Sequence, residues 1–162
     1  MNAKQAAAFK AVEYIKKGMV IGLGTGSTAY WAIQYLAERV KQGLQVTTVA
    51  TSAETEKIAL QCNIPVVSLD SVEYIDIDID GADEIDADMN LVKGGGGALL
   101  REKIVASASR AFIVIAGDSK RVEVLGKFPL PAEVIPFGWK HTARQLAALG
   151  CSTSLREKDA KI

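Results

Sequence analysis

The stretch MVIGLGTGST (residues 19–28) joins a short apolar run to a loop of glycines and hydroxyl residues. Residues 19–23 are predicted to form a buried strand, because a short apolar run that ends at glycines is typical of strands in a parallel sheet. A helix is expected from about Thr28 to Lys41, with Gly43 just past its end. This strand, turn and helix form the first half of a βαβ unit.

The same alternation continues along the chain. We predict helices at about 3–17, 51–62 (with Thr51 and Glu54 at capping-box spacing) and 98–109, and strands at 46–50, 65–69, 74–79, 89–92 and 112–116. Strands that alternate with helices through short turns form parallel sheets. The predicted fold class is therefore α/β, with an open, mostly parallel Rossmann-like sheet that has helices on both faces.

The composition changes after Gly126. Three of the four prolines, at positions 129, 131 and 136, favour an extended connection, and a helix is expected at about 140–149. One helix does not make a domain. We therefore expect a Rossmann-like domain over residues 1–127, followed at 128–162 by a linker and the incomplete start of a smaller α/β domain.

Charge and hydropathy exclude several classes of protein. The 19 Lys and Arg residues balance 19 Asp and Glu residues, so no overall positive charge favours nucleic acid or an anionic membrane. No apolar run approaches the roughly 18–20 residues of a spanning helix. Two isolated cysteines, Cys62 and Cys151, form no disulfide framework. These observations indicate a cytoplasmic globular protein without a nucleic-acid or membrane partner.

The loop at residues 22–28 is a candidate phosphate site. Its glycines let backbone N–H groups approach an anion, the following helix adds its positive N-terminus, and Thr25, Ser27 and Thr28 add hydroxyl donors. Residues 24–29 also fit the dinucleotide pattern GxGxxA, but no acidic residue follows the strand at 46–50 to bind a ribose. A compact phosphate is favoured over a dinucleotide and over a turn that binds nothing.

The segment DIDIDGADEIDAD (residues 76–88) is strongly acidic. Its opening resembles a calcium loop, but Ala87 stands where that loop requires a bidentate glutamate, and the preceding residues alternate like a strand. The alternation predicts that Asp76 and Asp78 lie on the solvent-exposed face of an edge strand. Asp80 and Asp83 flank a Gly-Ala turn at the carboxyl end of the strand, where ligands bind in open parallel sheets.

The segment KGGGGALLRE (residues 93–102) places four glycines between a strand and a helix. A purely structural loop rarely uses four glycines, because each one loses much conformational entropy on folding. Lys93 begins the loop, and Glu102 is a candidate general base one turn into the helix; alternatively, Glu102 is an ordinary first-turn glutamate. Lys120 follows the strand at 112–116 and is expected to reach a phosphate at the same edge of the sheet.

In this order, these segments resemble the A-type ribose-5-phosphate isomerases. The matching stretches are GLGTGST, TSAETEKIA, DIDIDGADEID, LVKGGGGALLREKI and IAGDSKRVEVLGKFPLPAEVIP. The resemblance implies interconversion of D-ribose 5-phosphate and D-ribulose 5-phosphate through an enediolate, in the non-oxidative branch of the pentose phosphate pathway. It also implies that no metal or redox cofactor takes part, and that the protein forms a homodimer or a higher homo-oligomer.

The resemblance carries family roles over to individual residues. It implies that Glu102 transfers the proton and that Asp80, Asp83 and Lys93 complete the catalytic set, with the ring-opening step left open between the two aspartates. The residues implied to bind substrate are Thr25, Gly26, Ser27, Thr28, Gly81, Ala82, Gly94, Gly95, Gly96 and Lys120.

Two other functions remain open at this stage. A sugar-phosphate sensor of related fold would keep the phosphate loop but would not need the acid–base residues. An acyl-CoA transferase would use a glutamate, here Glu102, as its nucleophile. Members of the resembled family continue past the point where this sequence ends, so we expect the second unit to be incomplete.

Overall fold

The computed structural model describes residues 1–156. The chain divides into two compact units, Met1–Pro131 and a second unit that begins at Ala132. The second unit contains one helix in its described part, α5 (Trp139–Ala147), which begins after Gly138. No helix within residues 1–156 is long and apolar enough to cross a membrane. Every candidate site residue lies in the first unit.

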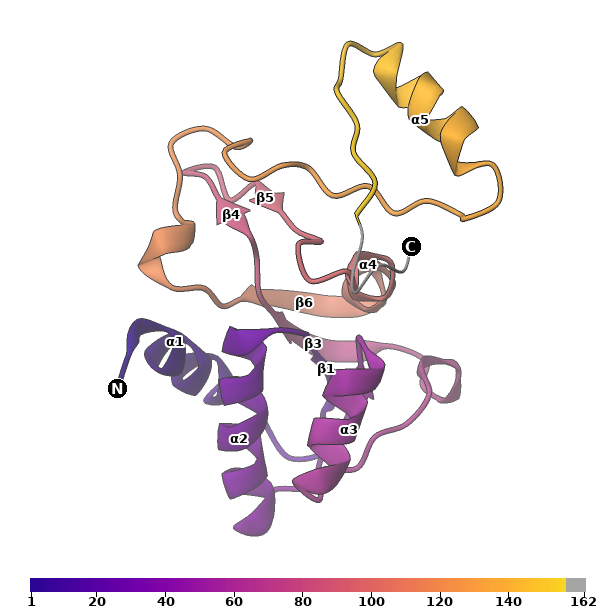
Figure 1. Cartoon of the computed structure of the whole chain (residues 1–162). Helices are drawn as coiled ribbons and strands as arrows, with labels where there is room; N and C mark the ends of the chain where they lie inside the picture. Colours follow the sequence, from indigo (N-terminus) through magenta and orange to yellow (C-terminus); the bar gives the residue numbers. More distant parts are fainter. Residues whose placement is uncertain (157–162) are drawn as a thin grey trace. The chain divides into compact units, whose positions relative to one another are not determined.

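A four-stranded parallel sheet forms the centre of the first unit (Figure 1). Its strand order is β2-β1-β3-β6, with bounds Thr47–Ala50 for β2, Val20–Leu23 for β1, Ile75–Asp80 for β3 and Ser109–Val114 for β6. All three neighbouring pairs run parallel. The predicted α/β class with a parallel sheet is confirmed.

Helices cover both faces of this sheet (Figure 1). One face carries α1 (Ala3–Val12), α2 (Ser27–Lys41) and α3 (Ala53–Gln61), and the other carries α4 (Leu99–Ser107). The main core fills the first face and includes Ile21, Leu36 and Ile79, each almost fully buried. A smaller cluster joins Val105 of α4 to Val49 and Ile75.

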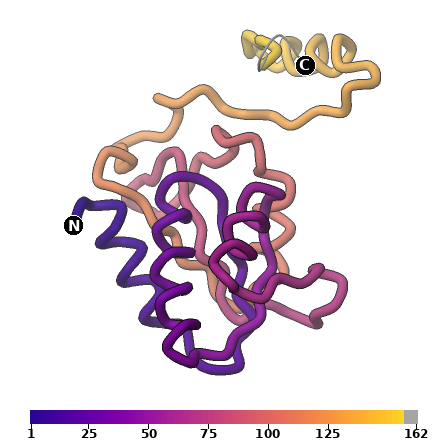
Figure 2. Tube along the Cα trace, turned by 60° about the horizontal axis from the view of Figure 1, so that its bottom comes forward, coloured from indigo at the N-terminus to yellow at the C-terminus, as the bar shows by residue number. Residues whose placement is uncertain are grey.

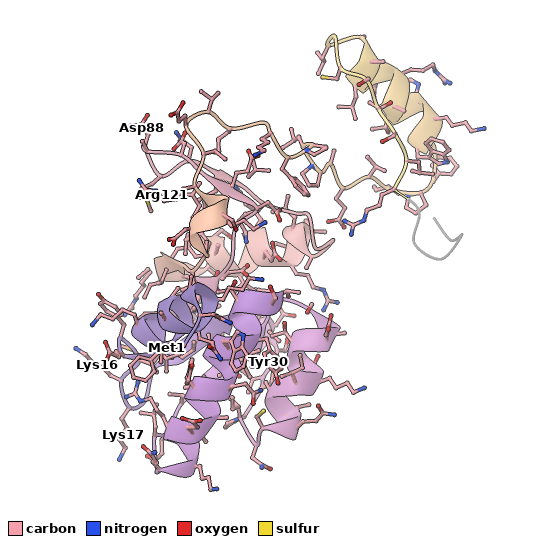
Figure 3. The ribbon with its side chains drawn as sticks, turned by 60° about the vertical axis from the view of Figure 1, so that its left-hand side comes forward. Met1, Lys16, Lys17, Tyr30, Asp88 and Arg121 are labelled. Atoms are coloured by element: carbon pink, nitrogen blue, oxygen red, sulfur yellow. The ribbon has the colours of Figure 1, made fainter. Side chains whose placement is uncertain are left out.

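Helix α1 packs beside α2 (Figure 2). The rings of Phe9 and Tyr35 meet edge to face with centroids 5.4 Å apart, and the Arg39 guanidinium donates to the carbonyl of Val12. This contact coincides with the end of α1 at Val12, so the predicted helix to residue 17 is too long. The turn that follows carries Lys16 and Lys17, which lie at the opposite end of the unit from Asp88 (Figure 3).

Several predicted local elements differ from the structure. The strand expected at 65–69 is only a single bridge from Val66 to Thr48, followed by the 3-10 turn η1 (Leu69–Ser71). The strand expected at 89–92 shrinks to β5 (Leu91–Val92), which pairs antiparallel with β4 (Glu84–Ile85) outside the main sheet. Helix α3 is capped by Ser52 rather than Thr51, because the Ser52 hydroxyl accepts from the Thr55 N–H.

Strand β3 is central in the sheet, not at its edge, because it lies between β1 and β6. The expected solvent-exposed face is therefore wrong for Asp78, which is 0% exposed. Its face of the sheet is covered by α4, whose Val105 lies close to Gly22 on the strand next to Asp78. Asp76 is half-buried; it accepts from the Val20 N–H at 2.8 Å and lies 3.8 Å from the Arg110 guanidinium.

Candidate active site

The carboxyl ends of β1, β3 and β6 lie at one edge of the sheet. The chain leaves β1 towards β2 on one side, whereas β3 and β6 lie on the other side. Such a reversal of strand order opens a crevice at the carboxyl edge, and ligands bind there in open α/β sheets. A pocket of about 260 Å³ lies at this position, lined by the segments that follow all three strands.

The pocket gathers most of the residues singled out from the sequence. Of that set, all but Asp80 and Gly95 line its wall: Thr25, Gly26, Ser27, Thr28, Gly81, Ala82, Asp83, Lys93, Gly94, Gly96, Glu102 and Lys120. Asp80 and Gly95 lie behind this wall and bond to Lys93 and Asp83 respectively. The pocket also includes residues that the sequence analysis missed, namely Lys4, Ala29, Ala116, Gly117 and Ser119.

A buried ammonium lies between two carboxylates at the pocket wall. The Lys93 Nζ is 3.0 Å from the Asp80 Oδ2 and 3.2 Å from the Glu102 Oε2, and it donates to the Gly81 carbonyl at 2.6 Å. The exposed fractions of the three side chains are 13% for Lys93, 1% for Asp80 and 6% for Glu102. Water therefore screens these charges weakly, and their mutual attraction is strong.

The same burial, together with the neighbouring charges, shifts the pKa values of Glu102 and Lys93. Burial raises the pKa of the Glu102 carboxyl, the negative charge of Asp80 raises it further, and Lys93 opposes both effects. For Lys93, burial acts to lower the pKa, but the carboxylates of Asp80 and Glu102 outweigh it and hold the pKa above its usual value. Lys93 thus stays charged, while Glu102 binds a proton more readily than an ordinary glutamate.

The turn after β1 is built around Asp80. The Asp80 Oδ1 accepts from the Thr25 N–H at 3.1 Å and from the Gly81 N–H at 2.7 Å. A Cβ at Gly24 would lie 2.1 Å from that oxygen and 2.6 Å from the Asp80 Cα. Position 24 therefore accepts only glycine while Asp80 keeps its place.

Asp83 is held by the glycine loop that follows Lys93. Its Oδ2 accepts from the Gly95 N–H at 2.7 Å, and a Cβ at Gly95 would lie 2.7 Å from its Oδ1 and 2.8 Å from the ring of Phe128. The neighbouring Glu84 is buried and accepts from the N–H groups of Gly126 and Phe128. Glu84 thereby anchors the segment that packs behind Gly95.

Cationic and N–H donors gather on the α2 side of the pocket. Helix α2 begins after Gly26 without a side-chain cap, which leaves its first-turn N–H groups available to an anion. The Lys4 ammonium donates to the Ser27 hydroxyl at 2.8 Å, and Lys120 reaches the pocket from the 3-10 turn η2 (Asp118–Lys120) after β6. Nothing in residues 1–18 signals the role of Lys4, because only the packing of α1 beside α2 brings it here.

The Thr25 hydroxyl supports the loop from the α3 side. It lies within hydrogen-bond distance of the hydroxyls of Thr51 (2.8 Å), Ser52 (2.9 Å) and Thr55 (3.1 Å). Thr51 and Thr55 in turn donate to the carbonyls of Leu23 and Gly24. The hydroxyls of the segment TSAET (residues 51–55) therefore hold the loop after β1 in place. The Thr25 hydroxyl, expected to donate to an anion, is already engaged in this network.

The acidic segment does not assemble a metal site. Within residues 1–156, no group of three or more His, Cys, Asp or Glu side chains is arranged to hold a metal ion. Asp78 and Asp80 lie within β3, whereas Asp86 accepts from the N–H groups of Asp88 and Asn90 in a separate exposed turn. The calcium-loop alternative therefore finds no support in this geometry.

This arrangement defines a Rossmann-like α/β protein with a buried Lys93–Glu102 ion pair at the wall of a pocket at the carboxyl edge of its sheet. A family profile described as ribose 5-phosphate isomerase A (phosphoriboisomerase A) matches residues 47–162. A relative named ribose-5-phosphate isomerase A, from Bacillus mycoides (strain KBAB4), is 55% identical over 161 residues, which cover 99% of this chain and 73% of the relative. The chain belongs to the ribose 5-phosphate isomerase A family.

Solved structures show the same relationship. Ribose 5-phosphate isomerase A from Methanocaldococcus jannaschii superposes with a TM-score of 0.94 at 42% identity, covering 98% of this chain and 72% of that one. A D-ribose-5-phosphate isomerase in complex with phospho-erythronic acid gives a TM-score of 0.93 at 41% identity, with the same coverage of both chains.

We predict that Gly24→Ala destabilises the protein, because the new methyl group meets the Asp80 backbone as well as its carboxylate. Overpacking of this kind costs about 1–3 kcal/mol. The free energy of unfolding, measured by urea titration, should fall accordingly. Gly96→Ala is the matched control, since a Cβ there meets nothing within 4 Å. Equal stability of the two variants would contradict the interlock of Gly24 and Asp80.

Proposed function

We propose that this protein interconverts D-ribose 5-phosphate and D-ribulose 5-phosphate. The observation that carries the proposal is the buried Lys93 ammonium, bonded to Asp80 and Glu102 at the wall of a pocket whose other residues include Lys4 and Lys120. Membership of the family supports it, as does the related isomerase structure that holds phospho-erythronic acid, an acid that carries a phosphate.

The phosphate of the substrate occupies the α2 side of the pocket. The uncapped N-terminus of α2 offers N–H donors and positive dipole, and Lys4 and Lys120 add two positive charges. The hydroxyls of Ser27 and Thr28 lie at the same side. The sugar carbons then extend from this anchor towards Lys93 and Glu102.

Glu102 is the base that moves the proton. The aldose C2 proton passes to the Glu102 carboxylate, and the C2–H electron pair forms the C1–C2 double bond of the enediolate while the C1 carbonyl oxygen takes the negative charge. The proton of the C2 hydroxyl then moves to the C1 oxygen, and Glu102 returns its proton to C1, which leaves a carbonyl at C2 and gives the ketose. A raised pKa suits both steps, because the carboxylate must accept a proton and then release it near neutral pH. The position of Glu102 one turn into α4, at the pocket wall, lets one carboxylate serve both carbons.

Lys93 stabilises the negative charge that develops on the sugar oxygens. Its ammonium is already oriented by Asp80 and the Gly81 carbonyl, so no large rearrangement is needed as charge develops. Because the carboxylates keep Lys93 protonated, it acts as a fixed positive charge rather than as a base.

Ring opening falls to Asp83 in this proposal. Asp80 does not line the pocket, and its two oxygens already accept from Thr25, Gly81 and Lys93. Asp83 lines the pocket, and within residues 1–156 its Oδ2 accepts from the Gly95 N–H. The Oδ1 of Asp83 then exchanges a proton with the ring oxygen and the C1 hydroxyl, while Asp80 orients Lys93.

The proposal extends to the setting of the reaction. We infer from family membership that the protein works in the cytoplasm, in the non-oxidative branch of the pentose phosphate pathway, as a homodimer or a higher homo-oligomer. The chemistry described above uses only side chains of this chain and needs no metal or redox cofactor.

Glu102→Gln should lower kcat by at least about 100-fold, because the amide cannot accept the C2 proton. The measurement is ketose formation from ribose 5-phosphate by EDTA-treated protein, with the exposed Glu56→Gln on α3 as control. Calorimetric affinity for ribose 5-phosphate should change little. If the parent protein binds the sugar phosphate but forms no ketose, the isomerase proposal fails and a sensor function replaces it.

Lys93→Ala should lower kcat about 100- to 1000-fold, as expected when a preorganised charge at the developing oxyanion is removed. Its loss should also raise the pKa of Glu102 further, because Lys93 favours the Glu102 carboxylate. The acidic limb of kcat/KM against pH should therefore move to higher pH. A change confined to KM would show instead that Lys93 binds substrate and transition state equally well.

Asp83→Asn should separate ring opening from proton transfer. The asparagine oxygen still accepts from Gly95 but does not exchange protons like a carboxylate, so turnover of ribose 5-phosphate should fall. Exchange of the C1 hydrogen of ribulose 5-phosphate in D₂O, followed by NMR, needs only the base and should persist. Glu102→Gln should abolish both. Equal loss of the two reactions in Asp83→Asn would refute the assignment.

A further inference from the structure

Asp78 is a buried acid that the proposed reaction does not use. It lies in the middle of β3, is 0% exposed, and neither of its carboxyl oxygens makes a hydrogen bond of good geometry among the described residues. A weak interaction with the Ile79 N–H is the smallest influence on its pKa. A buried polar group without a partner is costly, so such a group calls for an explanation. Its side chain shares a face of the strand with Asp80, on the side covered by α4.

The surroundings of Asp78 connect it to the site. On β1, its register partner Gly22 leaves room for it, since a Cβ there would lie 2.5 Å from the Asp78 Oδ1 and 2.8 Å from Val105 of α4. On β6, its register partner is Phe112, whose ring centroid lies 6.0 Å from the Lys93 Nζ. Neither neighbour titrates.

Three charged groups act on Asp78 within the described chain: Asp80 on its own strand, Glu102 on α4 and Lys93 in the loop after β5. Burial, followed by repulsion from Asp80, raises the pKa of the Asp78 carboxyl to about 7, with Lys93 acting in the opposite direction. Glu102 adds to the repulsion. The side chain is thus neutral in mildly acidic solution and becomes charged as the pH rises past neutrality.

We propose that Asp78 is a positioning residue that controls the charge of the active site from behind the Lys93–Glu102 pair. When neutral, it leaves the Lys93 ammonium to Asp80, Glu102 and the substrate. When ionised, it adds a buried negative charge close to the place where the enediolate forms. The kinetic part of this inference rests on the proposed isomerase function.

Ionisation of Asp78 should slow the reaction in two ways. The added charge repels the negative charge that develops on the sugar oxygens and offsets part of the stabilisation by Lys93. It also favours the protonated form of Glu102, so a smaller share of the protein holds a free base. Both effects grow as the pH rises, and turnover should decline on the alkaline side.

Asp78→Asn tests this inference, because it keeps the shape of the side chain but has no charge to gain. The ratio of its kcat to that of the parent should rise several-fold between about pH 6 and pH 8.5, an interval that spans the Asp78 titration. Asp76→Asn is the matched control: it lies on the same face of β3 but pairs with the exposed Arg110, and its ratio should stay level. A level ratio for Asp78→Asn as well would overturn the inference.

A second measurement is independent of activity. The folded protein retains the Asp78 proton in a pH range where the unfolded chain, with an ordinary aspartate pKa, releases it. Because the unfolded chain gains from releasing the proton in this range and the folded protein does not, the free energy of unfolding of the parent falls as the pH rises from about 4 to about 7. Asp78→Asn has no such proton, so its free energy of unfolding does not fall for this reason. The difference in Tm, variant minus parent, should rise across that range and then level off.

The two measurements together separate the possible failures. A rising Tm difference without any turnover in the parent would refute the isomerase function but keep the ionisation of Asp78. Turnover with a constant Tm difference and a constant kcat ratio would refute the role of Asp78 alone. Should the asparagine variant fail to fold, Asp78→Ala gives the same comparison, since it also removes the charge.

Discussion

The rest of the site depends on the two ion pairs that the Lys93 ammonium makes with Asp80 and Glu102. Burying charged groups is costly unless each finds a partner, and removing one partner leaves the other uncompensated. Lys93 bonds to Asp80 at the end of β3 and to Glu102 on α4, so it joins the end of the sheet to the helix that covers it. Lys93 and Glu102 both line the pocket, so this junction forms part of its wall.

The glycine-rich segments of this protein are explained as much by acids as by phosphate. Gly22, Gly24 and Gly95 each stand where a Cβ would collide with an aspartate, namely Asp78, Asp80 and Asp83 respectively. Glycines between a strand and a helix predict a loop that binds an anionic ligand, which fits the uncapped start of α2. The structure adds a second reason: the backbone must come close to buried carboxylates that shape the site from within.

The environment of Asp78 depends on whether its strand lies at the edge or in the centre of the sheet. In an edge strand Asp78 would be one more solvated acid. In the central strand, beneath α4, it is a third carboxyl beside Asp80 and Glu102, close to the Lys93 ammonium. The proposed charge control arises from this burial. Acidic groups confined in one site lose their protons in sequence rather than together. The pKa of the group that ionises last therefore depends on the charges that the other groups already carry.

The sequence by itself determined the α/β class, the strand–loop–helix segments and most of the residues that line the pocket, since apolar runs, glycines and acids each follow local rules. It also led to the family, through the order of five matching stretches. Only the tertiary structure decided that β3 is central, that Asp80 lies behind Lys93 while Asp83 faces the pocket, and that Lys4 reaches Ser27. These facts depend on which strands pair and which helices pack together, and such contacts between distant segments leave no periodic signal in one sequence.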